Sequence, residues 1–179
     1  MQEDGLGSYR RYLQGDRAAL EPLVETYSDA LVRYASYYVR SAAEDIAEDA
    51  FVALILKRKQ FREEGELKAY LFRIARNKCF DHLRRAWRTA PLGEELPSAD
   101  FESTIEERDR KKALYAAMGR IEAGYRDVLL LVYIEGFSVE ECTGILKKSR
   151  KQVYNLLARG KAALKKQLIK EGYHDAELS

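Results

Sequence analysis

The sequence predicts an all-α protein made of two small helical domains that an acidic linker joins. Its 179 residues include only 3 Pro and 11 Gly, and the alternating Val, Ile and Thr runs typical of strands are almost absent. Residues 1–88 carry 16 basic and 14 acidic side chains, residues 89–107 carry none and 6, and residues 108–179 carry 15 and 9. We therefore expect domains at 1–88 and 108–179, and an extended linker at 89–107 that holds two of the prolines.

Helical periodicity begins after a polar segment, residues 1–16, and Asp16 is positioned to cap the first expected helix. Apolar side chains then recur at three- and four-residue steps, which predicts a helix whose stripe belongs to the core. The stripe consists of Leu20, Leu23, Val24, Tyr27, Leu31, Tyr34, Ala35 and Tyr38. Ser41, followed three residues later by Glu44, predicts a capping box at the start of the next helix.

This second helix, AAEDIAEDAFVALILKRKQF, carries a cluster of acidic side chains on one face. The face consists of Glu44, Asp45, Glu48 and Asp49, and Val52 and Leu56 continue it toward the C-terminus. A solvated helix terminus would explain the acids, because the helix dipole favours negative charge in the first turns. The neighbouring apolar residues favour a second interpretation, a docking face for a basic partner helix, because they would supply a desolvated centre.

The third expected helix, Leu67 to Arg88, follows a loop at residues 61–66 and is both basic and amphipathic. Its apolar side includes Leu71, Phe72, Ala75 and Cys79, and its polar stripe consists of Tyr70, Arg73, Asn77, Asp81, Arg84 and Arg88. Basic side chains bind phosphate with release of counterions, and an aromatic ring can stack on an unpaired base. The stripe therefore favours nucleic acid as its ligand, with a solvated basic face as the alternative.

In the second domain the helical period returns near Glu106. The side chains expected to face inward are Ala113, Leu114, Ala117, Met118, Ile121, Tyr125, Val128, Leu129, Val132 and Tyr133. Ser138 with Glu141 predicts a capping box, and Ser149 is positioned to cap a last helix, RKQVYNLLARGKAALKKQLIK. A short helix, a tight turn and a longer helix predict a helix-turn-helix.

The last helix has the composition expected of a recognition helix. Val153, Leu156, Leu157, Gly160 and Leu164 share its inward side, and Lys151, Asn155, Ala158 and Ala162 lie opposite. Nine basic residues and no acidic residue lie between Lys147 and Lys170. Polar donors near the start of such a helix can contact base edges, and cations further along can contact phosphate.

Several classes of protein are disfavoured. Cys79 and Cys142 form no CxxC motif and have no nearby His, so we expect two buried thiols in a reducing compartment. No apolar run is long enough for a signal peptide or a membrane span, which leads us to expect a cytoplasmic protein. The chain lacks a phosphate-loop motif and an HExxH motif, and it has only two histidines, so we expect no enzyme activity, no cofactor and no metal.

With both motifs in view, the chain resembles the extracytoplasmic-function (ECF) sigma factors of bacterial RNA polymerase over about residues 10–170. Four stretches carry the resemblance: GDRAALEPLVETY, AAEDIAEDAF, LKAYLFRIARNKCFDHLRR, and YRDVLLLVYIEGFSVEECTGIL with its following helix. The resemblance implies a promoter-specificity subunit that binds core RNA polymerase and promoter DNA. An anti-sigma factor is a further candidate partner.

The resemblance also implies roles for particular residues. It implies that Glu44, Asp45, Glu48 and Asp49 dock on the coiled-coil clamp of the polymerase. It implies that the minus-ten element is bound and melted by the Phe61–Leu67 loop and by Tyr70, Arg73, Asn77, Arg84 and Arg85. It implies that the minus-thirty-five element is contacted by Arg150, Lys151, Gln152, Tyr154, Asn155 and Arg159. The acidic linker would thread the active-site and RNA-exit channels.

Two departures from the family pattern concern these sites. The family commonly has Lys, Ser and Arg where this chain has Tyr154, Asn155 and Leu156, and it more often has Trp where this chain has Tyr70. A stand-alone helix-turn-helix regulator remains the alternative function. The acidic helix discriminates the two, because a regulator does not need it.

Overall fold

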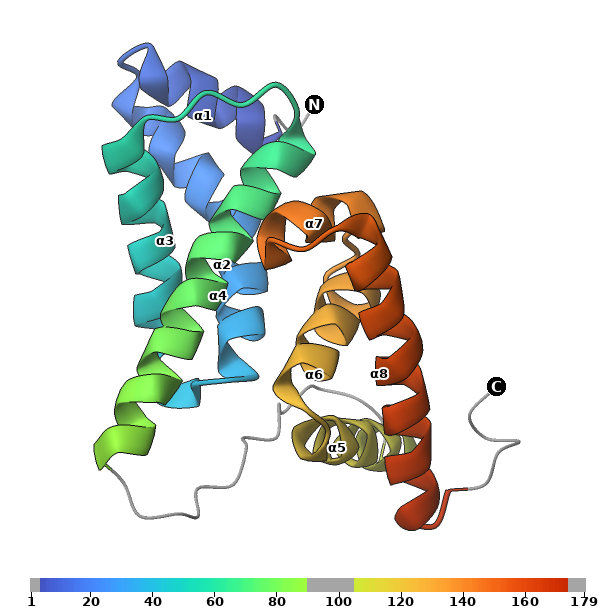
Figure 1. Ribbon diagram of the computed structural model, residues 1–179. Coiled ribbons are helices and arrows are strands. Elements are labelled where there is room, and N and C mark those ends of the chain that lie inside the picture. Colours follow the sequence, from blue (N-terminus) through green and yellow to red (C-terminus); the bar gives the residue numbers. More distant parts are fainter. Residues whose placement is uncertain (1–3, 90–104, 174–179) are drawn as a thin grey trace. The chain divides into compact units, whose positions relative to one another are not determined.

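The computed structural model of the chain describes residues 4–89 and 105–173, and within these ranges every regular element is a helix (Figure 1). The chain divides into two compact units. The first contains α1 to α4, and the second contains α5, α6, α8 and most of α7. The predicted all-α, two-domain fold is confirmed, and the predicted linker lies, except at its two ends, outside the described residues.

Three long helices form the body of the first unit. They are α2 (Leu20–Ser36), α3 (Ala43–Lys57) and α4 (Glu64–Thr89), and each packs against the other two. As predicted, Leu23, Leu31 and Tyr34 of α2 are fully buried. The Tyr34 ring lies 5.4 Å from the ring of Phe72 on α4, in a tilted arrangement that aromatic pairs favour.

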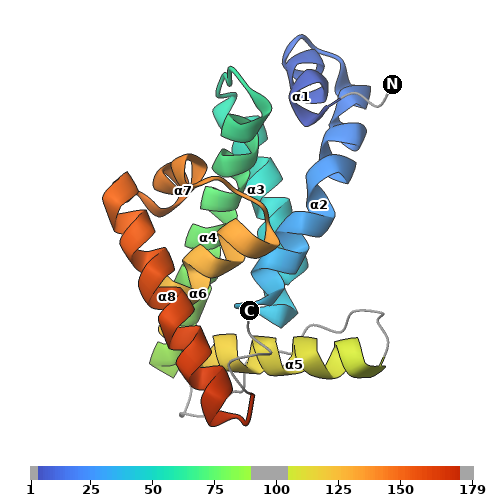
Figure 2. The ribbon, with the colours of Figure 1, turned by 90° about the vertical axis from the view of Figure 1, so that its right-hand side faces the viewer.

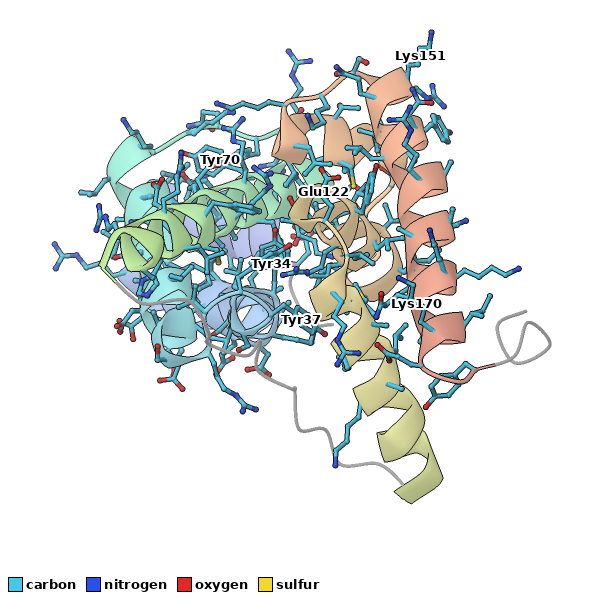
Figure 3. All side chains as sticks on the ribbon, turned by 60° about the horizontal axis from the view of Figure 1, so that its bottom comes forward. Tyr34, Tyr37, Tyr70, Glu122, Lys151 and Lys170 are labelled. Carbon is cyan, nitrogen blue, oxygen red and sulfur yellow. The ribbon has the colours of Figure 1, made fainter. Side chains whose placement is uncertain are left out.

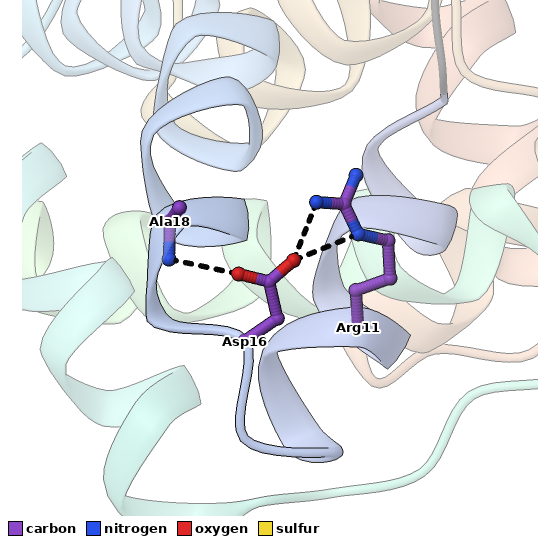
Figure 4. A network of polar contacts seen from close by, with 3 residues as sticks. All are labelled: Arg11, Asp16 and Ala18. Atoms are coloured by element: carbon purple, nitrogen blue, oxygen red, sulfur yellow. Dashed lines mark hydrogen bonds and ion pairs between the residues drawn. The ribbon is translucent and has the colours of Figure 1, made fainter.

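The start of α2 is fixed by the cap that the sequence predicts at Asp16. The Asp16 carboxylate accepts a hydrogen bond from the Ala18 backbone N–H at 3.1 Å and pairs with the Arg11 guanidinium (Figure 4). The hydrogen bond from Arg11 lowers the pKa of the Asp16 carboxyl below its usual value. The capped element is a 3₁₀ turn, η1 (Arg17–Ala19), which leads into α2.

The capping box predicted at Ser41 and Glu44 is wrong. A second 3₁₀ turn, η2 (Arg40–Ala42), incorporates Ser41, and the N-cap of α3 is Ala42, which makes no side-chain capping bond. The 3₁₀ turn bonds the backbone N–H of Ala43 to the Arg40 carbonyl, so a backbone acceptor replaces the expected side chain.

A further helix, α1 (Gly5–Leu13), forms within the segment that the sequence marks only as polar, and it packs on α2 and α4. Figure 2 shows α1 beside the start of α2. Asp4 caps it by accepting a hydrogen bond from the Gly7 N–H at 2.7 Å. Nine residues are too few for a stable helix in isolation. Burial of Leu6 and Tyr9 stabilises α1, and this tertiary contribution has no counterpart in helix propensity.

The second unit is built around α8 (Arg150–Lys170), which packs on α5 (Ile105–Arg120) and α6 (Ala123–Leu129). Gly160 allows the close approach of α8 to α6, because a Cβ atom there would lie 3.4 Å from side-chain atoms of both Leu129 and Tyr125. The Arg126 guanidinium donates hydrogen bonds to the Met118 and Gly119 carbonyls at 2.9 and 3.0 Å. These bonds satisfy carbonyls at the end of α5.

One predicted core residue of this unit is exposed. A π-helical turn, η3 (Leu130–Ile134), follows α6, and its Tyr133 side chain is 55% exposed, with the Lys161 ammonium 5.1 Å from its ring centroid. Bonding from residue i to i+5 widens the helix and shifts the faces of the residues that follow, so an α-helical period assigns Tyr133 to the wrong side.

The predicted helix-turn-helix is present. The short helix α7 (Val139–Leu146) begins with the capping box of Ser138 and Glu141, and α8 begins with a second box formed by Ser149 and Gln152. Between them the chain turns at Lys147, whose backbone is left-handed with φ of 52°. Its N–H bonds the Thr143 carbonyl, which ends α7 at that position.

Two expectations concern absences in the described parts of the chain. Among residues 4–89 and 105–173, no helix is long and apolar enough to span a membrane. The same ranges hold no group of three or more His, Cys, Asp or Glu side chains that could bind a metal ion. Both cysteines are buried, as predicted.

Candidate functional site

The acidic face of α3 lies on the surface of the first unit. Glu44, Asp45, Glu48 and Asp49 are all exposed. The apolar side chains that continue this face are also exposed, Val52 to 51% and Leu56 to 75%. The opposite side of α3, including Ala50 and Leu54, is fully buried. The fold therefore gives α3 one core side and one solvent side on which acids adjoin uncovered apolar groups.

A basic stripe, defined as Tyr70, Arg73, Asn77, Arg84 and Arg85, follows the outer side of α4. Tyr70 and Arg73 are half-buried, and the other three are exposed. The Arg84 guanidinium pairs with the Asp81 carboxylate at 2.5 Å, one turn away on the same helix. The apolar residues on the opposite side of α4, from Leu71 to Cys79, are fully buried, so the predicted amphipathic arrangement is present.

Two cations and one other aromatic ring lie close to the ring of Tyr70. The Arg73 guanidinium carbon and the Lys59 ammonium lie 5.3 and 5.2 Å from the Tyr70 ring centroid. The Phe61 ring lies 5.3 Å from the Tyr70 ring. A half-exposed aromatic ring beside two cations is suited to a nucleic-acid base together with its phosphate.

The loop before α4 lies three residues earlier in the chain than the sequence predicts, because α3 already ends at Lys57. It ends where α4 begins, at Glu64, and two residues of the predicted Phe61–Leu67 loop are core residues: Phe61 is 6% exposed and Leu67 is fully buried. Arg62, Glu63 and Glu66 remain exposed. We call residues 58–63 the α3–α4 loop. The part that can meet a ligand is therefore this loop together with the first turn of α4, through the backbone and polar side chains of residues 58–66.

Helix α1 contacts this loop through two side chains, Tyr9 and Arg10, that are not among the predicted site residues. The Tyr9 hydroxyl donates to the Lys59 carbonyl at 3.0 Å and lies 3.4 Å from the Leu54 carbonyl oxygen. The Arg10 guanidinium donates to the Phe61 and Arg62 carbonyls at 3.2 and 3.0 Å. Burial raises the pKa of the Tyr9 hydroxyl, which keeps it protonated as a donor.

A sequence signal for α1 does exist. Leu6, Tyr9 and Leu13 recur at three- and four-residue steps after Asp4, which is a helix-capping residue type. The signal is short, and no sequence pattern reveals which carbonyls the Tyr9 and Arg10 side chains reach.

In the second unit, the solvent face of α8 carries every residue predicted to contact the minus-thirty-five element. Arg150, Lys151, Gln152, Tyr154, Asn155 and Arg159 are all exposed. Figure 3 shows Lys151 extending into solvent near the start of α8. The Gln152 side-chain oxygen accepts a hydrogen bond from the Ser149 N–H at 2.8 Å, which leaves its amide N–H groups available as donors.

Tyr154 and Arg150 form a pair on this face. Tyr154 is 50% exposed, and the Arg150 guanidinium carbon lies 5.8 Å from its ring centroid. A side-chain hydrogen bond with Tyr154 raises the pKa of the Arg150 guanidinium above its usual value. The inward side of α8 is buried at Val153, Leu157 and Gly160, as predicted.

The fold and these surfaces define a helical DNA-binding protein of the helix-turn-helix class. Two family models match the chain, Sigma-70 region 2 over residues 23–89 and Sigma-70, region 4 over residues 111–164. Together they span more than half of its length.

Curated relatives resolve the class further. The chain is 29% identical over 157 residues to the ECF RNA polymerase sigma factor SigM of Mycobacterium tuberculosis, covering 86% of this chain and 79% of the relative. It is 24% identical over 172 residues to SigX of Bacillus subtilis, covering 87% and 88%. The chain therefore belongs to the ECF sigma factors and is a promoter-recognising sigma subunit of RNA polymerase.

Solved structures share the fold. The chain is similar to CnrH, solved in complex with the cytosolic domain of CnrY, with a TM-score of 0.70 and 25% identity over 96% of this chain and all of the other. It also matches the sigma factor RpoE of Bartonella quintana, solved with the anti-sigma factor NepR, with a TM-score of 0.67 and 21% identity over 86% and 98%. The stand-alone regulator is not favoured by any of these matches.

Proposed function

We propose that the three surfaces divide the work of promoter recognition among them. The acidic face of α3 docks on a basic helical element of core polymerase, the clamp coiled coil. The basic stripe of α4 with the α3–α4 loop binds and melts the minus-ten element, and the outer face of α8 contacts the minus-thirty-five element. The observation that carries this proposal is the exposure of Val52 and Leu56 beside four acids, since folding alone leaves them uncovered.

In this proposal the chain acts by binding and has no active site of its own. Core polymerase holds the two units at a set spacing, so two modest DNA affinities act jointly. Opening follows when an unstacked base of the non-template strand is captured beside Tyr70, which offsets part of the cost of unpairing, a few kcal/mol. Because this work is done on RNA polymerase and DNA, we place the protein in the cytoplasm.

The domain limits complete the proposal. We assign residues 1–88 to polymerase docking and the minus-ten element, residues 108–179 to the minus-thirty-five element, and the acidic residues 89–107 to the polymerase channels. Six acids without a basic residue would imitate the polyanion that such a channel holds.

The test is run-off transcription from a promoter library with core polymerase and this chain. We expect specific starts, and we expect Arg84→Ala with Arg85→Ala to lose DNA opening more than recruitment to the promoter. Arg17→Ala with Lys112→Ala is the matched control, because it removes two exposed charges outside the proposed surfaces. If the Arg84 and Arg85 variant opened DNA normally, the role of the basic stripe would be refuted.

Polymerase docking has a separate test. Charge reversal at Asp45 and Asp49 is expected to weaken binding to core polymerase while leaving the unit folded, because both carboxylates are exposed. Unchanged affinity for core polymerase would remove the acidic face from the proposal.

An anti-sigma factor is the further partner that we propose. Both solved relatives described above were determined as complexes with a protein partner, and one partner is named an anti-sigma factor. Pull-down with the tagged chain, repeated with the Leu56→Asp variant, would identify a partner that competes with polymerase for the exposed face of α3.

A further inference from the structure

The carbonyl groups of the α3–α4 loop are held from outside the loop. Residues 59–62 lie between two helices, so their backbone groups lack helical partners. Helix α1 supplies donors to three of the four carbonyls: Tyr9 to Lys59, and Arg10 to both Phe61 and Arg62. A single guanidinium nitrogen spans the last two carbonyls, which fixes the direction of the peptide group between them.

The two ends of the loop are also attached to α1. At the start, Arg58 has a left-handed backbone with φ of 47°, and its guanidinium donates to the Leu13 carbonyl at 3.0 Å. At the end, the Glu64 carboxylate accepts a hydrogen bond from the Leu6 N–H at 2.7 Å and another from the Tyr27 hydroxyl. The loop is therefore attached at both ends and along its length.

Ring contacts extend this support to Tyr70. The Phe61 ring lies 5.8 Å from the Tyr9 ring and 5.3 Å from the Tyr70 ring. The Lys59 ammonium lies 5.4 Å from the Phe61 ring and 5.2 Å from the Tyr70 ring. The position of the loop backbone thus determines where Lys59 and Phe61 meet Tyr70.

We propose that α1 is a positioning element for DNA opening, in which Tyr9 and Arg10 hold the α3–α4 loop and the ring of Tyr70 in the arrangement that receives an unstacked promoter base. This inference rests on the proposed role of the basic stripe. It assigns a function to a helix that lies before the matched Sigma-70 region 2, which begins at residue 23.

The physical basis is preorganisation. When a loop must become ordered during binding, the conformational entropy that it loses weakens the affinity. Only the fraction of molecules in which the loop is already ordered binds with the full intrinsic affinity. The bonds from Arg10 are charge-assisted. The bond from Tyr9 to Lys59 and the bond from Arg10 to Phe61 are partly buried, and the bond from Arg10 to Arg62 is exposed. Removing them is expected to lower affinity for a captured base by about tenfold.

The experiment measures how tightly the holoenzyme, core polymerase with this chain, binds a short single-stranded DNA. This DNA carries the non-template strand of the minus-ten element that run-off transcription from the promoter library identifies. The main variant combines Tyr9→Phe with Arg10→Ala. Tyr9→Phe keeps the buried ring and removes only the hydroxyl donor. We expect about tenfold weaker binding of the strand for the pair and about threefold for Tyr9→Phe alone, with unchanged affinity for core polymerase.

Two further variants separate positioning from charge. Arg11→Ala removes the same charge from the same helix. The Arg11 guanidinium pairs with the Asp16 carboxylate (Figure 4), so strand binding should stay normal if Arg10 acts by its position and not by its charge. Arg10→Lys keeps the charge and loses the planar fork, so we expect it to recover only part of the affinity.

The outcomes are decisive. Normal strand binding by the main variant would overturn the inference, as would an equal loss in Arg11→Ala or full recovery in Arg10→Lys, because charge alone would then explain the effect. If the main variant unfolds, Tyr9→Phe decides by the same criterion. Failure of the proposed function is distinguishable: in that case Arg84→Ala with Arg85→Ala also opens DNA normally.

Discussion

Leu56→Ala is expected to weaken binding to core polymerase without affecting the fold. The Leu56 side chain is 75% exposed. Full burial of a leucine contributes about 1.5–3 kcal/mol, so covering the exposed part on docking is worth about 1–2 kcal/mol. The dissociation constant should therefore rise by about 5- to 30-fold. The free energy of unfolding should change by less than about 0.5 kcal/mol, as for most surface substitutions.

Leu54→Ala is the matched control on the same helix. Leu54 is fully buried, so its truncation leaves a cavity and should cost about 2–5 kcal/mol of stability. Fluorescence anisotropy with labelled chain and core polymerase measures the affinity, and urea denaturation measures the stability. Two results would refute the reasoning: wild-type affinity in Leu56→Ala, or a loss of stability in Leu56→Ala comparable with that in Leu54→Ala.

Three further predictions concern the second unit. Ser149→Ala removes the hydroxyl that accepts from the Gln152 N–H and should cost about 1 kcal/mol in thermal unfolding, and an unchanged midpoint would contradict the cap. Gly160→Leu should cost about 1–3 kcal/mol through overpacking against Leu129, and a neutral result would refute the close contact. Burial raises the pKa of the Cys142 thiol to about 12 from 9.0, so the unfolded chain loses this proton first as pH rises. Stability should therefore be independent of Cys142 below pH 9 and fall between pH 9 and 12, and Cys142→Ala should remove this part of the pH dependence measured by urea denaturation.

The features that the sequence predicted correctly depend on periodicity and on local capping chemistry. The buried and exposed sides of α4 and α8 follow from residues spaced three and four apart, and Ser138 and Ser149 cap their helices by bonds that span three residues. Such signals lie within a few neighbouring residues. They survive folding when tertiary contacts agree with them.

The errors occurred where tertiary contacts or another helix type decided. The sequence predicts Ser41 at a cap, but a 3₁₀ turn incorporates it. It also predicts Tyr133 in the core, but a π-helical turn exposes it. Neither the 3₁₀ spacing of hydrogen bonds nor the π-helical spacing can be recognised from the pattern of apolar residues. The residues proposed to contact DNA and polymerase lie on the faces that periodicity indicated, and their roles stay predictions.

By itself, the sequence determined the helical class, the charged faces of α3, α4 and α8, and the helix-turn-helix, since each follows from the order of neighbouring side chains. Only the tertiary structure decided that α1 forms and that Tyr9 and Arg10 reach the carbonyls of residues 59–62, some 50 positions further along the chain. A short helix gains its stability, and a loop its shape, from partners distant in sequence, because burial and hydrogen bonding depend on distance in space.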